Sequence, residues 1–430
     1  MSNNVERAAP VAVLSPAPDE SSAGFKISPQ QWKSGAAAWM GWFFDGLDMH
    51  LYLLVAVPFV TLLLHAHKGD PRIAQTSGWI QAAFLVGWAL GGGFFGRFGD
   101  LLGRSRALSW TILTYALFTG LSFFAQTWWQ LLICRFVAAL GIGGEWAVGA
   151  SLLSETWPSH WRPWLAAILQ TGVNLGVLVA CGVEYVLAPY SPRWVFLVGI
   201  VPALIVFWIR RSVPEPQEWH DARRESAERP RIANLFSSAI RRTTVLTIIV
   251  CATSLTAWWA FMFWSFQQIQ GVKDVTSWSD ADRTRLGVHA FFMIISVSIA
   301  GNFFGGWLAK LLGYRQAIAL MFLGFFAAMF GTYIVPRDHV SLLIWMPWVG
   351  FFSGVFGLFT MYVPALFPTL LRTTGAGFSY NIGRLAAAAG TVLFGMVAQV
   401  RDLRVALLCS SLLFLPAMAV TFLLPNLRDR

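Results

Sequence analysis

The sequence predicts an all-α membrane protein with twelve transmembrane helices, arranged as two pseudo-symmetric bundles of six. Three observations support this prediction: the composition, the length of the apolar runs and an internal repeat. Apolar residues make up 56% of the 430 residues and charged residues 12%, about half the charged share of a soluble domain. So little polar surface cannot cover a water-soluble globule, and we therefore expect lipid to cover part of the chain.

Apolar runs of membrane-spanning length recur along the whole chain. A bilayer core about 30 Å thick needs about 20 apolar residues of helix to cross it. Because lipid cannot satisfy the open edge of a sheet, these runs are predicted to be helices. The predicted spans are residues 36–62, 78–97, 107–126, 130–153, 163–188, 193–210, 243–269, 286–309, 316–335, 341–366, 374–398 and 403–424.

The polar segments divide the chain into four parts. Residues 1–30 are rich in Ala, Pro and Ser and lack the apolar stretch of a signal peptide, which predicts a disordered cytoplasmic tail. Residues 212–242 form the one long polar interruption. We interpret them as a cytoplasmic linker between a first bundle at 31–211 and a second bundle at 243–430.

The positive charges predict the orientation. If the N-terminus is inside, the inner segments carry twenty Lys and Arg residues and the outer loops carry nine. This bias favours both termini in the cytoplasm and a location in the inner or plasma membrane. The net charge of +10 is therefore a topology signal, and no nucleic-acid partner is expected.

The two halves repeat at a constant offset of 210 residues. The offset brings residues 96–103 onto 306–313, with Leu-Leu-Gly in both copies, and it also aligns Pro158 with Pro368 and Arg162 with Arg372. One offset that holds across two separate loops indicates an internal duplication. Parallel repeats related by an axis along the membrane normal place a central site between them, near the middle of the membrane.

Two loop motifs resemble a known family. Residues 96–106 read GRFGDLLGRSR, and this segment resembles the loop between the second and third helices of the major facilitator superfamily. The resemblance implies a gate in which Asp100 lies where helix ends meet and Arg104 pairs with it or with helix C-termini. Glu155 and Arg162 flank the next inner loop and are expected to brace that gate. The second copy lacks the aspartate and the first arginine, so only the first half retains the charged gate.

Further motifs resemble one branch of that superfamily. Residues 135–146 read RFVAALGIGGEW, residues 155–162 read ETWPSHWR and residues 372–384 read RTTGAGFSYNIGR. These closely resemble the metabolite:proton symporters, a branch that includes sialate and lactate permeases. Residues 44–48, FDGLD, fit the same branch and the related aromatic-acid symporters. The resemblance implies a proton-coupled importer of a small organic monocarboxylate that works by alternating access.

Three acidic residues inside predicted spans are candidates for the proton carrier. Charges inside the membrane cost at least about 2.5 kcal/mol each, so they indicate function. Asp45 and Asp48 are three residues apart and share a helix face, and we favour Asp48 as the carrier with Asp45 second. The alternative for either is a pairing role with a neighbouring helix. Glu145 either holds a proton or fixes an arginine of another helix. His50 points away from Asp48 and is expected to pack elsewhere.

Arg384 is the candidate for binding the substrate anion. It is the only cation in the interior of a second-half span, and a guanidinium binds a carboxylate through two parallel hydrogen bonds. The alternative is a buried partner for Asp45, Asp48 or Glu145. Asn174 occupies the equivalent position in the first half. The neutral residues expected to hydrogen-bond the substrate are Gln170, Asn174, Tyr380 and Asn381.

Other functions remain as alternatives. Proton-driven efflux of a drug or metabolite would use the same acids, and a sugar symporter is also possible, although Arg384 argues for an anion. A nutrient sensor would need a large soluble signalling tail. An enzyme would need a metal-like or nucleophile cluster, and the chain has no HisxxHis, CysxxCys or GlyxSerxGly pattern. We therefore expect no enzymatic activity and no cofactor, with protons, an organic anion and lipid as partners of a monomer.

Overall fold

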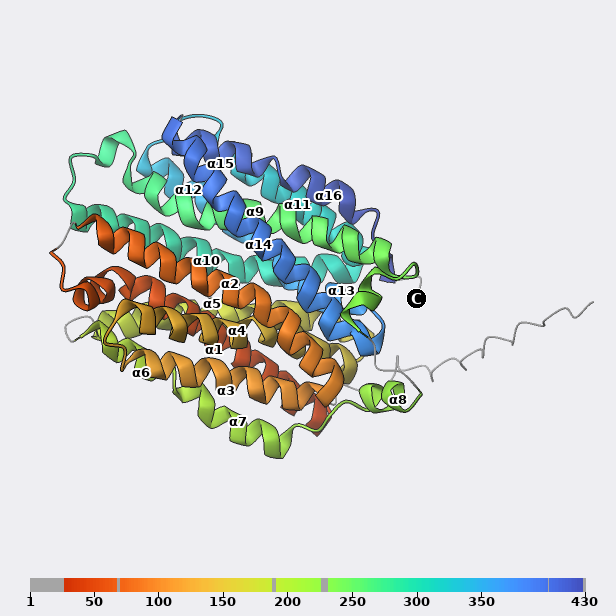
Figure 1. The fold of residues 1–430 in the computed structure, drawn as a ribbon. Helices are drawn as coiled ribbons and strands as arrows, with labels where there is room; N and C mark the ends of the chain where they lie inside the picture. The colour runs from red at the N-terminus through yellow and green to blue at the C-terminus, as the bar shows by residue number, and fades with distance from the viewer. Residues whose placement is uncertain (1–26, 68–69, 188–190, 226–230, 401, 428–430) are drawn as a thin grey trace, which may run out of the picture.

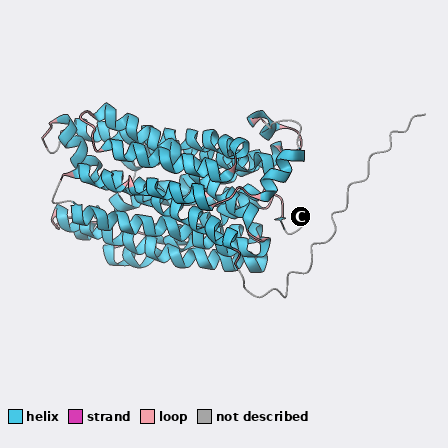
Figure 2. Ribbon diagram, turned by 90° about the horizontal axis from the view of Figure 1, so that it is seen from below, coloured by secondary structure: helices cyan, strands magenta, loops and turns pink. Residues whose placement is uncertain are grey.

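The structure is a computed structural model that describes residues 27–67, 70–187, 191–225, 231–400 and 402–427. Within these residues the chain forms sixteen α-helices and five short 3-10 segments, and no strand (Figure 2). The predicted N-terminal tail lies outside the described residues up to residue 26.

The first half of the chain supplies seven helices, which trace six crossings. Helices α6 and α7 form one crossing that is broken at Gly199 and Ile200, because Pro202 in the first turn of α7 lacks the N–H that would continue the helix. The helices are α1 (Pro29–Leu64), α2 (Pro71–Leu102), α3 (Arg104–Ser122), α4 (Trp128–Thr156), α5 (Arg162–Leu187), α6 (Val195–Val198) and α7 (Val201–Ser212).

The second half supplies eight helices, which also trace six crossings. Helices α12 and α13 form one crossing broken at Ser353 and Gly354, and α15 and α16 form another, near Pro416. The helices are α9 (Arg241–Gln270), α10 (Asp280–Leu312), α11 (Tyr314–Tyr333), α12 (His339–Phe352), α13 (Val355–Ala365), α14 (Arg372–Val400), α15 (Leu403–Ser411) and α16 (Phe414–Thr421). The remaining helix, α8 (Gln217–Glu225), lies in the linker.

The halves lie side by side, as the red-to-green and the green-to-blue helices of Figure 1 show. Between them, α2 packs against α14 and α5 packs against α10. We call the end of the molecule at which α8 lies the linker end. Within the described residues, eight of the twelve crossings are long and apolar enough to span a membrane by length and composition alone. Large apolar side chains such as Leu90 and Phe94 of α2 are exposed, as expected for a surface covered by lipid.

The helix boundaries repeat at the offset found in the sequence. Helices α2 and α10 end at Leu102 and Leu312, and the next residues, Gly103 and Gly313, have φ angles of 108° and 87°. Only glycine adopts such angles without strain. The 3-10 segments Ser159–Trp161 and Thr369–Leu371, which precede α5 and α14, are also 210 residues apart.

Candidate functional site

Arg384 of α14 lies at the interface between the two halves. Its guanidinium carbon is 3.7 Å from the centroid of the Trp88 ring on α2 and 4.7 Å from that of Tyr380. Nη1 donates a hydrogen bond of 2.8 Å to Oδ1 of Asn381, and Nε has no partner among the described residues. No described carboxylate lies within ion-pair distance of the guanidinium, so aromatic faces and one amide hold this buried cation.

Aromatic rings from five helices are linked to this cation, two directly and three through contacts with other rings. Tyr380 stacks on Trp146 of α4 with ring centroids 4.2 Å apart and planes at 16°. On the other side, Trp88 meets Trp259 of α9 edge to face at 5.9 Å. Trp146 in turn stacks on Trp42 of α1. The sequence alone does not single out these tryptophans, because the chain has 22 of them and tryptophan is common at membrane interfaces.

Asn381 orients Arg384 and also joins two helices. Its Oδ1 accepts from Arg384 at 2.8 Å, and its Nδ2 donates to the carbonyl of Gly377 at 2.8 Å. The amide lies against Gly92 of α2, where any larger residue would collide with it. The sequence predicts that Asn381 contacts the substrate, but in the structure both the oxygen and the nitrogen of its amide form hydrogen bonds within the protein.

Asp45 and Glu145 form a buried acidic pair. Their side chains belong to α1 and α4 and are 7% and 0% exposed. The Glu145 carboxyl fills the space left by Gly41, one turn before Asp45, and interacts with Asp45 and with Tyr115 of α3. No described residue meets hydrogen-bond geometry with Oδ1 of Asp45 or with either oxygen of Glu145. Two adjacent buried carboxyls cannot both remain charged without a cation, so this arrangement suits a proton-holding site.

Asp48 has a different partner. Its carboxylate binds Arg135 of α4 through bonds of 2.9 Å and 3.2 Å to the two guanidinium Nη atoms, and it accepts a 2.5 Å hydrogen bond from the hydroxyl of Thr119. Both charged side chains are almost fully buried. The guanidinium of Arg135 also lies over the rings of Tyr52 and Phe84. Asp48 and Arg135 therefore form a complete ion pair, whereas Asp45 lies beside another acid.

The charged motif between α2 and α3 joins the two halves at the linker end. The guanidinium of Arg104 is buried and donates to Asp100 at 2.9 Å, to Glu155 at 2.8 Å and to the carbonyl of Thr369 in the second half at 2.7 Å. Asp100 in turn accepts from the backbone N–H of Thr374 at 2.8 Å, in the first turn of α14. The predicted gate residues Asp100, Arg104 and Glu155 are thus in contact with one another and with the second half.

Arg162, the fourth predicted gate residue, donates to the carbonyl of Ser154 at 2.7 Å. Its counterpart Arg372 binds Glu155 at 3.2 Å and Glu218 of α8 at 2.8 Å. The repeat aligns Arg372 with Arg162, but the sequence predicts no gate role for Arg372 and gives no indication of Glu218. The alignment of the two halves at the offset of 210 residues is the sequence feature that could have indicated a gate role for Arg372.

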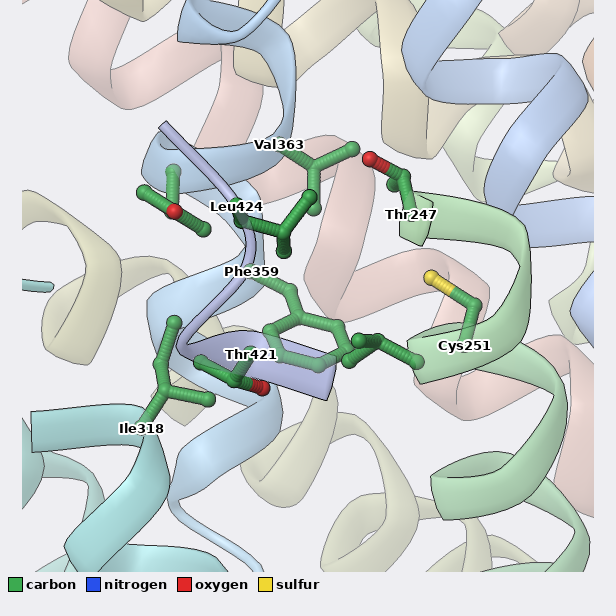
Figure 3. A pocket seen from close by; sticks show the side chains of 9 residues that line it. Thr247, Cys251, Ile318, Phe359, Val363, Thr421 and Leu424 are labelled. Atoms are coloured by element: carbon green, nitrogen blue, oxygen red, sulfur yellow. The ribbon is translucent and has the colours of Figure 1, made fainter. Parts of the chain in front are cut away.

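A small cavity lies between the halves near α5 and α10. The predicted residues Gln170 and Asn174 line it, together with His50 and Trp259. Asn174 donates to the carbonyl of Ile295 at 3.2 Å and to the hydroxyl of Ser298, so it bridges the two halves. A second cavity, lined by Thr247, Cys251 and Phe359 among others, is apolar and lies within the second half (Figure 3). Its lining includes no charged group, so we do not assign it to the site.

The sequence and the fold both match known transporters. The model of the Major Facilitator Superfamily matches residues 38–391. The sialic acid transporter NanX of Escherichia coli K12 is 27% identical over 399 residues, covering 90% of this chain and 93% of that one. A probable 4-methylmuconolactone transporter of Cupriavidus pinatubonensis is 31% identical over 383 residues, covering 86% of this chain and 85% of that one. The niacin transporter NiaP of Acinetobacter baylyi is 28% identical over 378 residues, covering 82% of this chain and 84% of that one.

Solved structures share the fold at low sequence identity. The proton:xylose symporter XylE superposes with a TM-score of 0.75 at 15% identity, covering 92% of this chain and 96% of that one. The human organic anion transporter MFSD10 gives a TM-score of 0.70 at 16% identity, covering 92% and 100%. These similarities confirm the predicted fold class, twelve helices in two bundles.

Proposed function

This chain belongs to the Major Facilitator Superfamily, as the loop motifs indicated, and we propose that it imports a small organic monocarboxylate together with a proton. The chain is a multi-pass membrane transporter and not an enzyme.

The observation that carries the proposal is the state of Arg384. A guanidinium buried at the interface of the halves has no carboxylate within ion-pair distance in the described part of the chain, and its Nε is unpartnered. A buried cation without a counter-ion is costly. A substrate carboxylate would supply the missing anion through two parallel hydrogen bonds. A neutral sugar would leave this charge uncompensated.

The rings around Arg384 favour a flat or cyclic carboxylate. Trp88 and Tyr380 flank the cation, and Trp146 extends the stack. Aromatic faces bind planar groups in offset or edge-to-face contacts. Similarity to transporters of niacin and of sialic acid supports a carboxylate that carries a ring.

We propose that Asp45 and Glu145 hold the coupled proton. The charge of Asp45 interacts with both Glu145 and Arg384. Arg384 can compensate either Asp45 or the substrate carboxylate. If the substrate takes Arg384, Asp45 must carry a proton, and when the substrate leaves, Asp45 can release that proton and return to Arg384. This exchange would couple one proton to one carboxylate. Asp48, our first choice from the sequence, becomes the weaker candidate because Arg135 already neutralises it.

We place the linker end and both termini in the cytoplasm, because the Lys and Arg residues concentrate there. The contacts of Arg104 and Arg372 across the halves would then keep the cytoplasmic side closed in this conformation. Alternating access requires these contacts to break when the protein opens inward. The same orientation implies an inner-membrane protein with its substrate arriving from outside.

Counterflow into proteoliposomes tests the substrate class. We expect wild-type protein to exchange labelled carboxylates such as benzoate, nicotinate or lactate, and not to exchange neutral sugars. Arg384→Lys keeps the charge but loses the two-pronged geometry, so binding of the carboxylate should weaken by more than tenfold. Arg384→Ala should abolish exchange. If folded Arg384→Ala binds the carboxylate as tightly as wild type, or if only sugars exchange, the proposal is wrong.

A further inference from the structure

The cavity near α5 and α10 contains polar groups that the Arg384 site does not use. Helices α1 and α5 of the first half line it together with α9, α10 and the end of α12 from the second half. It therefore lies in the interface that must rearrange during transport. Its polar lining residues are His50, Gln170, Asn174, Ser298, Asn302 and Ser353.

Asn302 of α10 brings an unused hydrogen-bond donor to this cavity. Its side chain is 2% exposed, and its Nδ2 has no partner among the residues that the structure describes. The neighbouring amide of Asn174, by contrast, donates to Ile295 and Ser298. Buried amide groups are nearly always hydrogen-bonded. The amide of Asn302 is therefore poised for an acceptor atom that is not part of the protein.

His50 brings an acceptor to the same cavity. Its Nδ1 is 2.9 Å from the carbonyl oxygen of Gly46. A carbonyl only accepts, so Nδ1 carries the hydrogen, and in the neutral imidazole Nε2 is then the acceptor. The ring also lies 6.1 Å from that of Phe291 on α10. This packing holds the imidazole at the boundary between the halves.

Two indole rings in contact link the cavity to Arg384, with Trp259 on the cavity side and Trp88 on the side of the cation. Trp258, Trp259 and Met262 of α9 form the apolar side of the cavity. Trp259 meets Trp88 edge to face at 5.9 Å, and Trp88 carries the guanidinium of Arg384 on its face. Trp259 of the second half therefore borders the cavity, and Trp88 of the first half, which is in contact with it, borders the cation.

We propose that this cavity binds a hydroxyl group of the substrate, remote from the substrate's carboxylate. The hydroxyl oxygen accepts from Nδ2 of Asn302, and the hydroxyl hydrogen is donated to Nε2 of His50. A keto or ether oxygen has no hydrogen for His50, an ammonium group has no lone pair for Asn302, and a methyl group satisfies neither. The inference rests on the proposed function, because it assumes that Arg384 binds the carboxylate. It specifies the substrate class as hydroxylated carboxylates.

Titration calorimetry on the purified full-length protein tests this assignment with benzoate, 3-hydroxybenzoate and 4-hydroxybenzoate. For wild type we expect at least one hydroxylated ligand to bind about tenfold or more tightly than benzoate, because both polar groups then gain a partner. Asn302→Leu and His50→Phe should each bring that ratio close to one while benzoate affinity changes little. Thr332→Val is the matched control. It removes a buried hydroxyl on α11 that bonds to the carbonyl of Ala328, and it should leave the ratio unchanged.

The outcomes separate this inference from the proposed function. If benzoate binds in an Arg384-dependent way and the hydroxyl gives no gain in wild type, the hydroxyl subsite is refuted and the carboxylate site stands. The same holds if the gain survives both Asn302→Leu and His50→Phe. If none of the three carboxylates binds to wild type, the proposed function falls and this inference falls with it.

Discussion

The guanidinium of Arg384 lies 3.7 Å from the centre of the Trp88 ring, so a cation of the second half rests on an aromatic face of the first. Such contacts stabilise a cation by about 0.5–2 kcal/mol, most when water is excluded. They leave the N–H groups at the guanidinium edge free to bind an anion. Trp88 therefore holds Arg384 in place without competing with a carboxylate for its hydrogen bonds.

Replacing Trp88 by Leu should weaken carboxylate binding by about 2–30-fold, the range that the loss of such a contact corresponds to. The reason is that Arg384 would have to be ordered by the ligand itself. Trp88→Phe keeps an aromatic face and should fall between wild type and Trp88→Leu. Calorimetry with benzoate measures both. Equal affinities for wild type and Trp88→Leu would show that the ring does not orient Arg384.

The ion pair between Asp48 and Arg135 is predicted to be structural. Asp48→Asn leaves a fully buried guanidinium without its counter-ion, and breaking a buried pair in this way typically costs about 3–5 kcal/mol. We expect a large fall in the thermal midpoint of the detergent-solubilised protein. Arg285→Gln removes the exposed partner of Asp282 and serves as the control, with little change. A midpoint for Asp48→Asn close to that of Arg285→Gln would contradict a structural role.

Proton coupling should depend on the pair of Asp45 and Glu145. Asp45→Asn cannot release a proton, so it should abolish accumulation driven by a pH gradient while exchange of the carboxylate across the membrane continues. Glu145→Gln should reduce the coupling as well, because it removes the second carboxyl of the pair. Uptake into proteoliposomes with and without an imposed gradient, beside counterflow of the same carboxylate, separates the two activities. If the double variant Asp45→Asn, Glu145→Gln still accumulates the carboxylate when a pH gradient is imposed, neither residue carries the coupled proton.

The fold could be predicted from the sequence because a segment that crosses lipid must be apolar, helical and long enough to span the membrane. Apolar runs of spanning length predict helices, and the offset of 210 residues reappears at Gly103 and Gly313 and in the 3-10 segments before α5 and α14. The observed helices extend beyond the predicted spans, α2 for example covering 71–102 where 78–97 was predicted. The helices continue beyond the apolar core of the membrane. The residues there are more polar, so hydropathy does not indicate that they are helical.

The partners within the site were harder to predict, because helical spacing gives the face of a residue but not the helix opposite that face. Asp45 and Asp48 share one face by spacing, yet the first meets Glu145 and the second meets Arg135. Arg135 and Glu145 are ten residues apart on α4, about 15 Å along its axis, and the structure shows no bond between them among the described side chains. The tryptophans gave no signal, since their number hides the few that line the site.

The gate at the linker end is expected to depend on Arg104. The guanidinium of Arg104 is fully buried and reaches Asp100, Glu155 and the carbonyl of Thr369 at once. A lysine ammonium cannot span these three acceptors, because it lacks the planar fork of arginine. Arg104→Lys should therefore weaken the contact between the halves and populate the conformation that is open at this end.

A cysteine at position 373 reports this opening, because Thr373 is 0% exposed and its backbone N–H binds Asp100. In a background without the four native cysteines, an impermeant thiol reagent should label Thr373→Cys slowly from the linker end. Adding Arg104→Lys should raise the labelling rate about tenfold or more, which corresponds to losing one charged hydrogen bond. Arg106→Lys, two residues away and exposed, is the control and should leave the rate unchanged. Because the rate reports access to a buried position, equal rates in Arg104→Lys and Arg106→Lys would mean that Arg104 does not hold the gate closed.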